Sequence, residues 1–224
     1  RGRQRGRDQA GAGQAGPAAQ AVFALWAGEP FCQQLAETAA PVLSALPGRT
    51  LSPADWHVTL CFLGEVDEAL MQPLGERAAL IDARAFELRF ERLEYWREAR
   101  VIAASAAAAV PERALALAGA LWAAAGTLGL RVDERPLRPH VTLARGVPAQ
   151  AGQGLAGDLG AAGAGPELVL AAREFYLAAS RGLPRGPAAG RASAGQAAAV
   201  QVAAGQVAAA PAGLPRRYVT LARW

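Results

Sequence analysis

WHVTLCFLG, residues 56–64, contains a tetrapeptide that occurs twice in the chain. His57-Val58-Thr59-Leu60 recurs 83 positions later as His140-Val141-Thr142-Leu143, and the 224 residues contain no other histidine. Polar and apolar residues alternate in both copies, which is typical of a strand with one buried face. Because side chains alternate faces along a strand, each histidine points to the same side as the threonine two residues later. We therefore expect two strands that each present an imidazole and a hydroxyl to a shared cleft.

These side-chain types suit proton-transfer chemistry around a phosphate. An imidazole, with an ordinary pKa of about 6.5, can accept or donate a proton near neutrality. A threonine hydroxyl can donate a hydrogen bond to a phosphate oxygen as charge shifts in the transition state. His57 and His140 are therefore candidate catalytic residues, and Thr59 and Thr142 are candidate substrate-binding residues. This chemistry requires neither a metal ion nor a cofactor.

Elsewhere in the chain, the pattern predicts a mixture of strands and helices. Short apolar or alternating runs bounded by Gly, Pro or Asp predict strands at 22–26, 56–64, 86–96, 100–106, 140–145, 167–180 and 217–224. Helical spacing of apolar residues predicts helices at 30–46, 67–83 and 111–130, with Asp67 as the N-cap of the second. The segments 86–96 and 100–106 are expected to pair antiparallel. The fold class indicated is α+β.

Two segments differ in composition from the rest. Residues 1–20 carry four arginines against Asp8 and have almost nothing to bury, so we expect a disordered tail. Residues 181–215 are rich in Ala, Gly, Gln and Pro, which predicts a low-complexity insertion. Residues 21–224 are therefore expected to form a single domain that contains this insertion.

The charge distribution excludes one class of function. The formal net charge is +4, of which the tail supplies +3, so residues 21–224 are close to neutral. A protein that grips a long duplex needs clustered basic residues, whereas a small phosphorylated ligand or an RNA end remains compatible with this body. No apolar run reaches the roughly 18 residues of a membrane span, so we expect a cytoplasmic protein, with Cys32 and Cys61 as reduced thiols.

Other candidate site residues are weaker. Cys61 lies four residues from His57 on one strand, too far for a direct Cys-His dyad, and is better explained as an apolar filler. Arg145 falls, under strict alternation, on the face opposite His140, so without a bulge it stays outside the site. Trp56 and Trp96 are candidates for stacking on a base, although core packing is the commoner use of Trp in strands.

Two further arginines, Arg138 and Arg100, have no role that the sequence alone establishes. A zinc site would need a third ligand, and neither repeated motif carries an Asp or Glu nearby in phase.

WHVTLCFLGEV and RPHVTLARG resemble the two signature motifs of the 2H phosphoesterase superfamily, in the branch of bacterial and archaeal RNA 2′,3′-cyclic phosphodiesterases once called 2′-5′ RNA ligases. The resemblance covers residues 22–180 and 216–224. It implies two pseudo-symmetric lobes whose antiparallel sheets face a central cleft, with helices on the outside. It also implies that His57 is the general acid and His140 the general base in hydrolysis of a 2′,3′-cyclic phosphate to a 2′-phosphomonoester, without metal or cofactor.

Two alternatives stay open at this point. The same site could join RNA halves through a 2′-5′ bond, or the protein could be a non-catalytic module that binds RNA ends. Intact histidines in both motifs favour an enzyme, because arginine serves pure phosphate binding better. The expected partners are RNA ends or nucleoside 2′,3′-cyclic phosphates, and we expect a monomer. The sequence does not indicate the base preference or the role of residues 181–215.

Overall fold

The computed structural model describes residues 18–47, 49–106, 108–131, 135–152, 156–158, 168–180 and 218–224. Residues 1–17 of the expected tail, and the whole expected insertion at 181–215, lie outside the described residues. Residues 18–20 were assigned to the tail, but they form the start of the first strand, where they pair with residues 65–67. Backbone pairing, which composition does not reveal, corrects that boundary.

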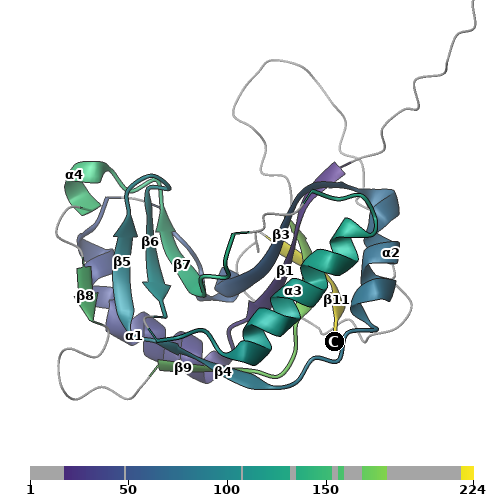
Figure 1. The fold of residues 1–224 in the computed structure, drawn as a ribbon. Coiled ribbons are helices and arrows are strands. Elements are labelled where there is room, and N and C mark those ends of the chain that lie inside the picture. Colours follow the sequence, from purple (N-terminus) through teal and green to yellow (C-terminus); the bar gives the residue numbers. More distant parts are fainter. Residues whose placement is uncertain are drawn as a thin grey trace, which may run out of the picture.

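Most strands of the described part belong to one antiparallel sheet (Figure 1). Its order is β11-β10-β1-β3-β7-β6-β5-β8, and a short ninth strand, β2, pairs with β7. The strands are β1 (Ala18–Trp26), β2 (Arg49–Thr50), β3 (His57–Asp67), β5 (Arg92–Trp96), β6 (Val101–Ser105), β7 (His140–Arg145), β8 (Ala156–Asp158), β10 (Tyr176–Ser180) and β11 (Tyr218–Arg223). A second sheet contains β4 (Phe86–Phe90) and β9 (Leu168–Ala172).

The large sheet has two halves that mirror each other in strand order. β11, β10, β1 and β3 form one half, and β8, β5, β6 and β7 form the other. The halves meet where β3 and β7 pair through Val58 and Val141. Figure 1 shows the two halves rising on either side of this junction. The two histidine strands are therefore the innermost strands of the two halves.

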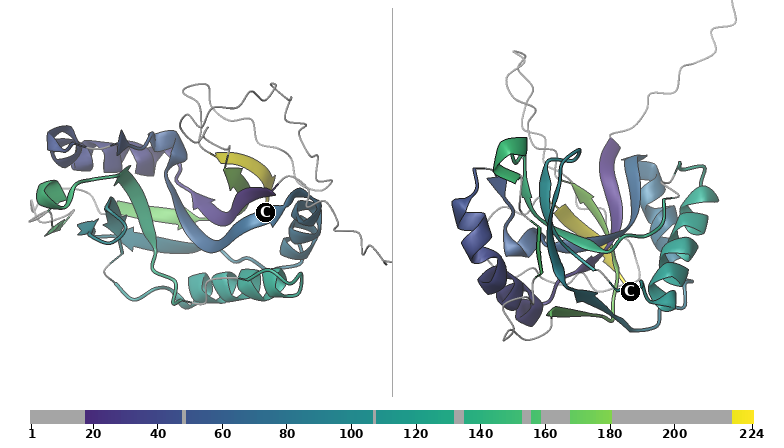
Figure 2. Two further views of the ribbon diagram at one scale, coloured as in Figure 1. Left: turned by 90° about the horizontal axis from the view of Figure 1, so that it is seen from above. Right: turned by 60° about the vertical axis from the view of Figure 1, so that its left-hand side comes forward.

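The helices lie outside the sheet, as expected. They are α1 (Glu29–Ala45), the short 3₁₀ helix η1 (Pro53–Asp55), α2 (Glu68–Ala78), α3 (Glu112–Gly126) and α4 (Ala149–Gly152). α2 and α3 pack against β3 and each other, whereas α1 contacts β9 and lies on the other side of the molecule (Figure 2). The Asp67 carboxylate accepts a hydrogen bond from the Ala69 amide at 2.9 Å, which confirms this residue as the N-cap of α2.

One hydrophobic core runs beneath both halves. It contains fully buried residues of β1, β3, β6, β7 and α3, among them Phe23, Leu60, Ile102, Leu143 and Leu121. Because the same core supports β3 and β7, the two histidine strands are held in a fixed relation to each other. No helix of the described part is long and apolar enough to span a membrane.

Several predicted boundaries need correction. The segments 86–96 and 167–180 were each expected to be one strand, but each breaks into two because the chain passes from the small sheet to the large one. The expected pairing of 86–96 with 100–106 holds for β5 and β6.

Two helices are also shorter than predicted. α2 ends at Ala78, before the predicted residue 83, and α3 ends at Gly126. Gly129 follows α3 with φ of +77°, a left-handed conformation that stops a helix.

Candidate active site

A cleft of about 980 Å³ lies where the two halves of the sheet meet. All four residues predicted for the site line it: His57 and Thr59 from β3, and His140 and Thr142 from β7. The two copies of the repeat, 83 positions apart in the chain, therefore contribute to a single cleft. The other lining side chains used below are Phe62, Trp96, Arg97, Glu98, Arg135, Arg138 and Arg145.

The strand register brings these side chains together. Val58 and Val141 are Cα partners in an antiparallel pair, and both are fully buried. Their neighbours along each strand point to the opposite face, which is the face of the cleft. Continuing the antiparallel register by one residue in each direction places His57 across from Thr142, and Thr59 across from His140. In this register, each histidine therefore corresponds to the threonine of the other copy.

Both imidazoles are oriented by the same local contact. Nδ1 of His57 lies 2.7 Å from the carbonyl oxygen of Asp55, and Nδ1 of His140 lies 2.8 Å from that of Arg138. Because a carbonyl oxygen can only accept, Nδ1 of each ring carries the hydrogen and donates it. In the neutral form, Nε2 of each ring then carries the lone pair.

A tryptophan packs on each ring. Trp26 stacks on His57 with ring centroids 5.1 Å apart and an interplanar angle of 20°. Trp96 lies against His140 with centroids 4.5 Å apart and an angle of 52°. These contacts restrict rotation of the rings and shield them from water, while both rings still line the cleft.

The environment favours the neutral form of both histidines. Burial lowers the pKa of His57 to about 4, and the positive charges of Arg145 and His140 add to the effect, whereas the hydrogen bond to Asp55 opposes it. Burial also lowers the pKa of His140, helped by the charges of Arg138 and Arg145. Protonating either ring therefore becomes easier once an anion enters the cleft.

Arg145 was expected outside the site, and the structure corrects that expectation. It lines the cleft, because β7 contains a β-bulge: Ile102 pairs with Ala144 and Ala103 with Thr142, so Leu143 is the extra residue. The bulge reverses the alternation and brings Arg145 to the face of His140. The apolar doublet Leu143-Ala144, both members of which are buried, is the sequence signal that strict alternation overlooked.

β3 contains a bulge at the matching place. Phe23 pairs with Cys61 and Ala24 with Thr59, so Leu60 is the extra residue, as Leu143 is in β7. Cys61 consequently lies in the core, at 1% exposure. Phe62, the counterpart of Arg145 in the repeat, is 46% exposed and lines the cleft. The two halves of the site thus differ at this position, with a cation on one side and a phenyl ring on the other.

The two tryptophans considered for base stacking lie in different places. Trp56 belongs to the core at 2% exposure, whereas Trp96 lines the cleft beside His140. Arg138 also lines the cleft, while Arg100, with φ of +54°, lies between β5 and β6 and is not among the lining residues. No three His, Cys, Asp or Glu side chains among the described residues are grouped as metal ligands.

The fold and the cleft define an α+β protein in which two His-x-Thr strands share one pocket, and comparison with known proteins agrees. The model of the LigT like Phosphoesterase family matches residues 28–103. A curated protein of Geobacillus stearothermophilus, named RNA 2′,3′-cyclic phosphodiesterase, is 36% identical over 106 residues, which are 46% of this chain. The match spans only about a third of that relative's length, 34%.

Solved structures extend the similarity to almost the whole chain. E. coli LigT complexed with 3′-AMP has a TM-score of 0.68 at 24% identity, with 93% of this chain and 98% of LigT covered. TT0787 of Thermus thermophilus has a TM-score of 0.57 at 26% identity, with 74% of this chain and 90% of TT0787 covered. Together these findings confirm the resemblance to the LigT-like phosphoesterases of the 2H superfamily, and the α+β fold that it implied.

Proposed function

We propose that this protein is a phosphodiesterase that hydrolyses 2′,3′-cyclic phosphates at RNA ends or on nucleosides, leaving a 2′-phosphomonoester. The observation that carries the proposal is the convergence of His57, Thr59, His140 and Thr142 on one cleft, next to Arg145 from the bulge of β7. The name of the G. stearothermophilus relative supports the same substrate.

The reaction needs two proton transfers at phosphorus. Nε2 of His140 accepts a proton from water, whose oxygen attacks phosphorus. The bond from phosphorus to the ribose 3′ oxygen breaks, and Nε2 of His57 donates a proton to that leaving oxygen. His57 thus begins protonated and His140 neutral, and the cycle ends with the opposite arrangement, which proton exchange with solvent resets. The hydrogen bonds to the Asp55 and Arg138 carbonyls keep both Nε2 atoms available for these transfers.

The remaining polar groups stabilise charge. Thr59 and Thr142 lie on the same strands as the histidines and donate hydrogen bonds to the two non-bridging oxygens. Arg145 adds a fixed positive charge that favours the phosphorane-like transition state.

The protonation of His57 depends on the substrate. With a pKa of about 4 in the unliganded protein, His57 is neutral at pH 7. The negative charge of the bound phosphodiester offsets the charge of Arg145 and raises the pKa of both imidazoles. Substrate binding therefore prepares the acid as well as placing the phosphorus.

Incubation with a nucleoside 2′,3′-cyclic phosphate in EDTA tests this function. We expect turnover to the 2′-phosphomonoester with a bell-shaped pH profile, and a loss of about 10²- to 10⁴-fold in kcat for His57→Ala and for His140→Ala. Binding without turnover would favour a non-catalytic RNA-end module instead. A 3′-phosphomonoester product would reverse the assignment of the leaving oxygen.

A further inference from the structure

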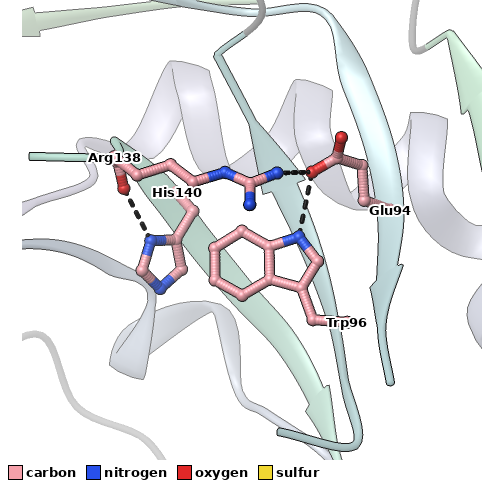
Figure 3. Close-up of polar contacts among 4 residues, drawn as sticks. All are labelled: Glu94, Trp96, Arg138 and His140. Carbon is pink, nitrogen blue, oxygen red and sulfur yellow. Dashed lines mark hydrogen bonds and ion pairs between the residues drawn. The ribbon is translucent and has the colours of Figure 1, made fainter. Parts of the chain in front are cut away.

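Three side chains on the β5 and β7 side of the cleft form a connected cluster beside His140 (Figure 3). The Glu94 carboxylate accepts a hydrogen bond from the Trp96 indole at 2.9 Å and one from the Arg138 guanidinium at 2.6 Å, both at Oε2. The guanidinium carbon of Arg138 lies 4.4 Å from the Trp96 ring centroid, within cation-π range. Trp96 in turn packs against His140.

We propose that Glu94 is a positioning residue for His140. Its carboxylate holds the Trp96 indole, which packs on the imidazole, and the Arg138 side chain, which covers the indole. The catalytic meaning of this role rests on the proposed function of His140. Glu94 itself is not among the residues that line the cleft, so it acts through Trp96 and Arg138 rather than on the substrate.

The strand pairing explains how Glu94 reaches this cluster. Glu94 and Trp96 are two residues apart on β5 and therefore lie on one face, while the neighbouring Leu93 faces the core at 6% exposure. Across the sheet, Glu94 pairs with Ala103, and Ala103 pairs with Thr142. The small alanine between them leaves space for the Trp96 indole to extend over β6 to His140.

Arg138 fixes the imidazole in two ways. Its carbonyl oxygen accepts the hydrogen bond from Nδ1 of His140 at 2.8 Å, and its guanidinium covers the Trp96 ring that packs on the same imidazole. The Arg138 side chain is 60% exposed, whereas that of Glu94 is only 22% exposed. The carboxylate is therefore the more buried partner of this ion pair, and it holds the guanidinium over the Trp96 ring.

The carboxylate is fully charged in this environment. Burial raises the pKa of Glu94, but hydrogen bonds from Trp96 and Ser105 and the charge of Arg138 outweigh it and lower the pKa below its ordinary value. This negative charge lies against Arg138, one of the two arginines whose charges lower the pKa of His140.

The tryptophan at the other imidazole donates to a different kind of acceptor. The Trp26 indole, which stacks on His57, donates to the backbone carbonyl of Ala54 at 3.1 Å. A neutral acceptor thus holds the tryptophan at His57, and a charged one holds the tryptophan at His140. This difference makes the effect of Glu94 specific to one ring, which an experiment can detect.

The other charged groups around His140 line the same cleft. Arg138 and Arg145 lower its pKa directly, His57 faces it from β3, and Arg97, Glu98 and Arg135 lie further along the cleft wall. Removing the charge of Glu94 leaves this set more positive. The pKa of His140 should then fall further below its ordinary value.

Two variants separate geometry from charge. Glu94→Gln keeps an oxygen acceptor for Trp96 and Arg138 but removes the negative charge, whereas Glu94→Ala removes both the acceptor and the charge. Asp82→Asn is the control, because it breaks the exposed ion pair of Asp82 with Arg84, at 3.1 Å, away from the cleft. We expect kcat to fall about tenfold in Glu94→Ala and less in Glu94→Gln, with KM changed less than kcat, and no change in Asp82→Asn.

The histidine count makes a direct readout possible. Because the chain has two histidines, ¹⁵N-histidine NMR gives two sets of ring signals, which His57→Gln assigns. Titration of Glu94→Gln should show a lower pKa for His140 and an unchanged His57. Unchanged His140 signals in both Glu94 variants would overturn the proposal, as would equal shifts of the two rings. A wild-type protein that fails to turn over cyclic phosphate would instead overturn the proposed function, because the NMR result does not depend on turnover.

Discussion

Replacing Arg145 by Gln should change both the rate and the pH dependence of the reaction. The bulge at Leu143 brings this guanidinium into the cleft, where its charge lowers the pKa of His57 and of His140. A charge-assisted hydrogen bond to a phosphate contributes about 1.5–3 kcal/mol, so its loss should lower kcat/KM by roughly 10- to 150-fold.

The pH profile tests the direction in which the pKa values of the histidines shift, which the rate alone does not show. Arg145 disfavours the imidazolium form of both rings, so its removal raises both pKa values towards the ordinary value of about 6.5. The bell-shaped profile of kcat/KM reports the pKa values of the free enzyme, and it should therefore move to higher pH in Arg145→Gln. Arg145→Lys keeps the charge but loses the planar guanidinium fork that can bind a phosphate through two parallel hydrogen bonds, so its profile should stay in place while its rate falls.

The assay is hydrolysis of a nucleoside 2′,3′-cyclic phosphate, with kcat/KM measured between about pH 4 and pH 9. Arg49→Gln is a matched control, because Arg49 pairs with Arg145 across β2 and β7 but is exposed and does not line the cleft. A rate within twofold of wild type in Arg145→Gln, or a profile displaced towards acid, would refute this account of the bulge.

Four further substitutions test other parts of the structure. Thr59→Val and Thr142→Val should each lower kcat about 10-fold or more, measured by the same assay, since each removes a donor to a non-bridging oxygen. His57→Gln should reduce the acid sensitivity of folding. The pKa of His57 is about 4 in the folded protein, below its unfolded value of about 6.5, so the free energy of unfolding of the wild type is full above pH 6.5 and falls by about 2 kcal/mol by pH 4.5. Urea titration should show that this loss is absent in the variant. Gly146→Ala, at φ of +68° with open space around the new Cβ, should cost about 1 kcal/mol and lower Tm by about 2–4 °C in a thermal melt.

The repeat alone predicted the faces of four site residues, for a simple physical reason. Strand alternation operates over two residues, so the side of His57 fixes the side of Thr59, and the same holds for His140 and Thr142. The expected helix cap at Asp67 was confirmed for a similar reason, because the contact spans two residues. Local geometry of this kind requires no knowledge of the rest of the fold.

Features that depend on distant pairing could not be predicted in this way. Arg145 was placed on the wrong face because a bulge at Leu143 is defined by its partner strand β6. For Trp96, both base stacking and core packing were considered, but its contacts with Arg138 and Glu94 could not be predicted, because these residues lie 42 and two positions away along the chain and meet on one indole. The break between β4 and β5 likewise depends on which sheet each segment joins.

The two halves of the site are alike in the repeat and different around it, and this difference matters more for catalysis than the likeness. Identical His-Val-Thr-Leu segments and matching bulges give both imidazoles the same orientation, with Nδ1 bound to a backbone carbonyl. An acid and a base must nevertheless differ in protonation while they act. We infer that unmatched neighbours contribute to that difference: Phe62 stands where the other half has Arg145, and a backbone carbonyl holds the tryptophan at His57 where Glu94 holds the one at His140. In the proposed mechanism, symmetry of the backbone brings two equivalent rings to one phosphorus, and asymmetry of the surrounding charges gives them separate tasks.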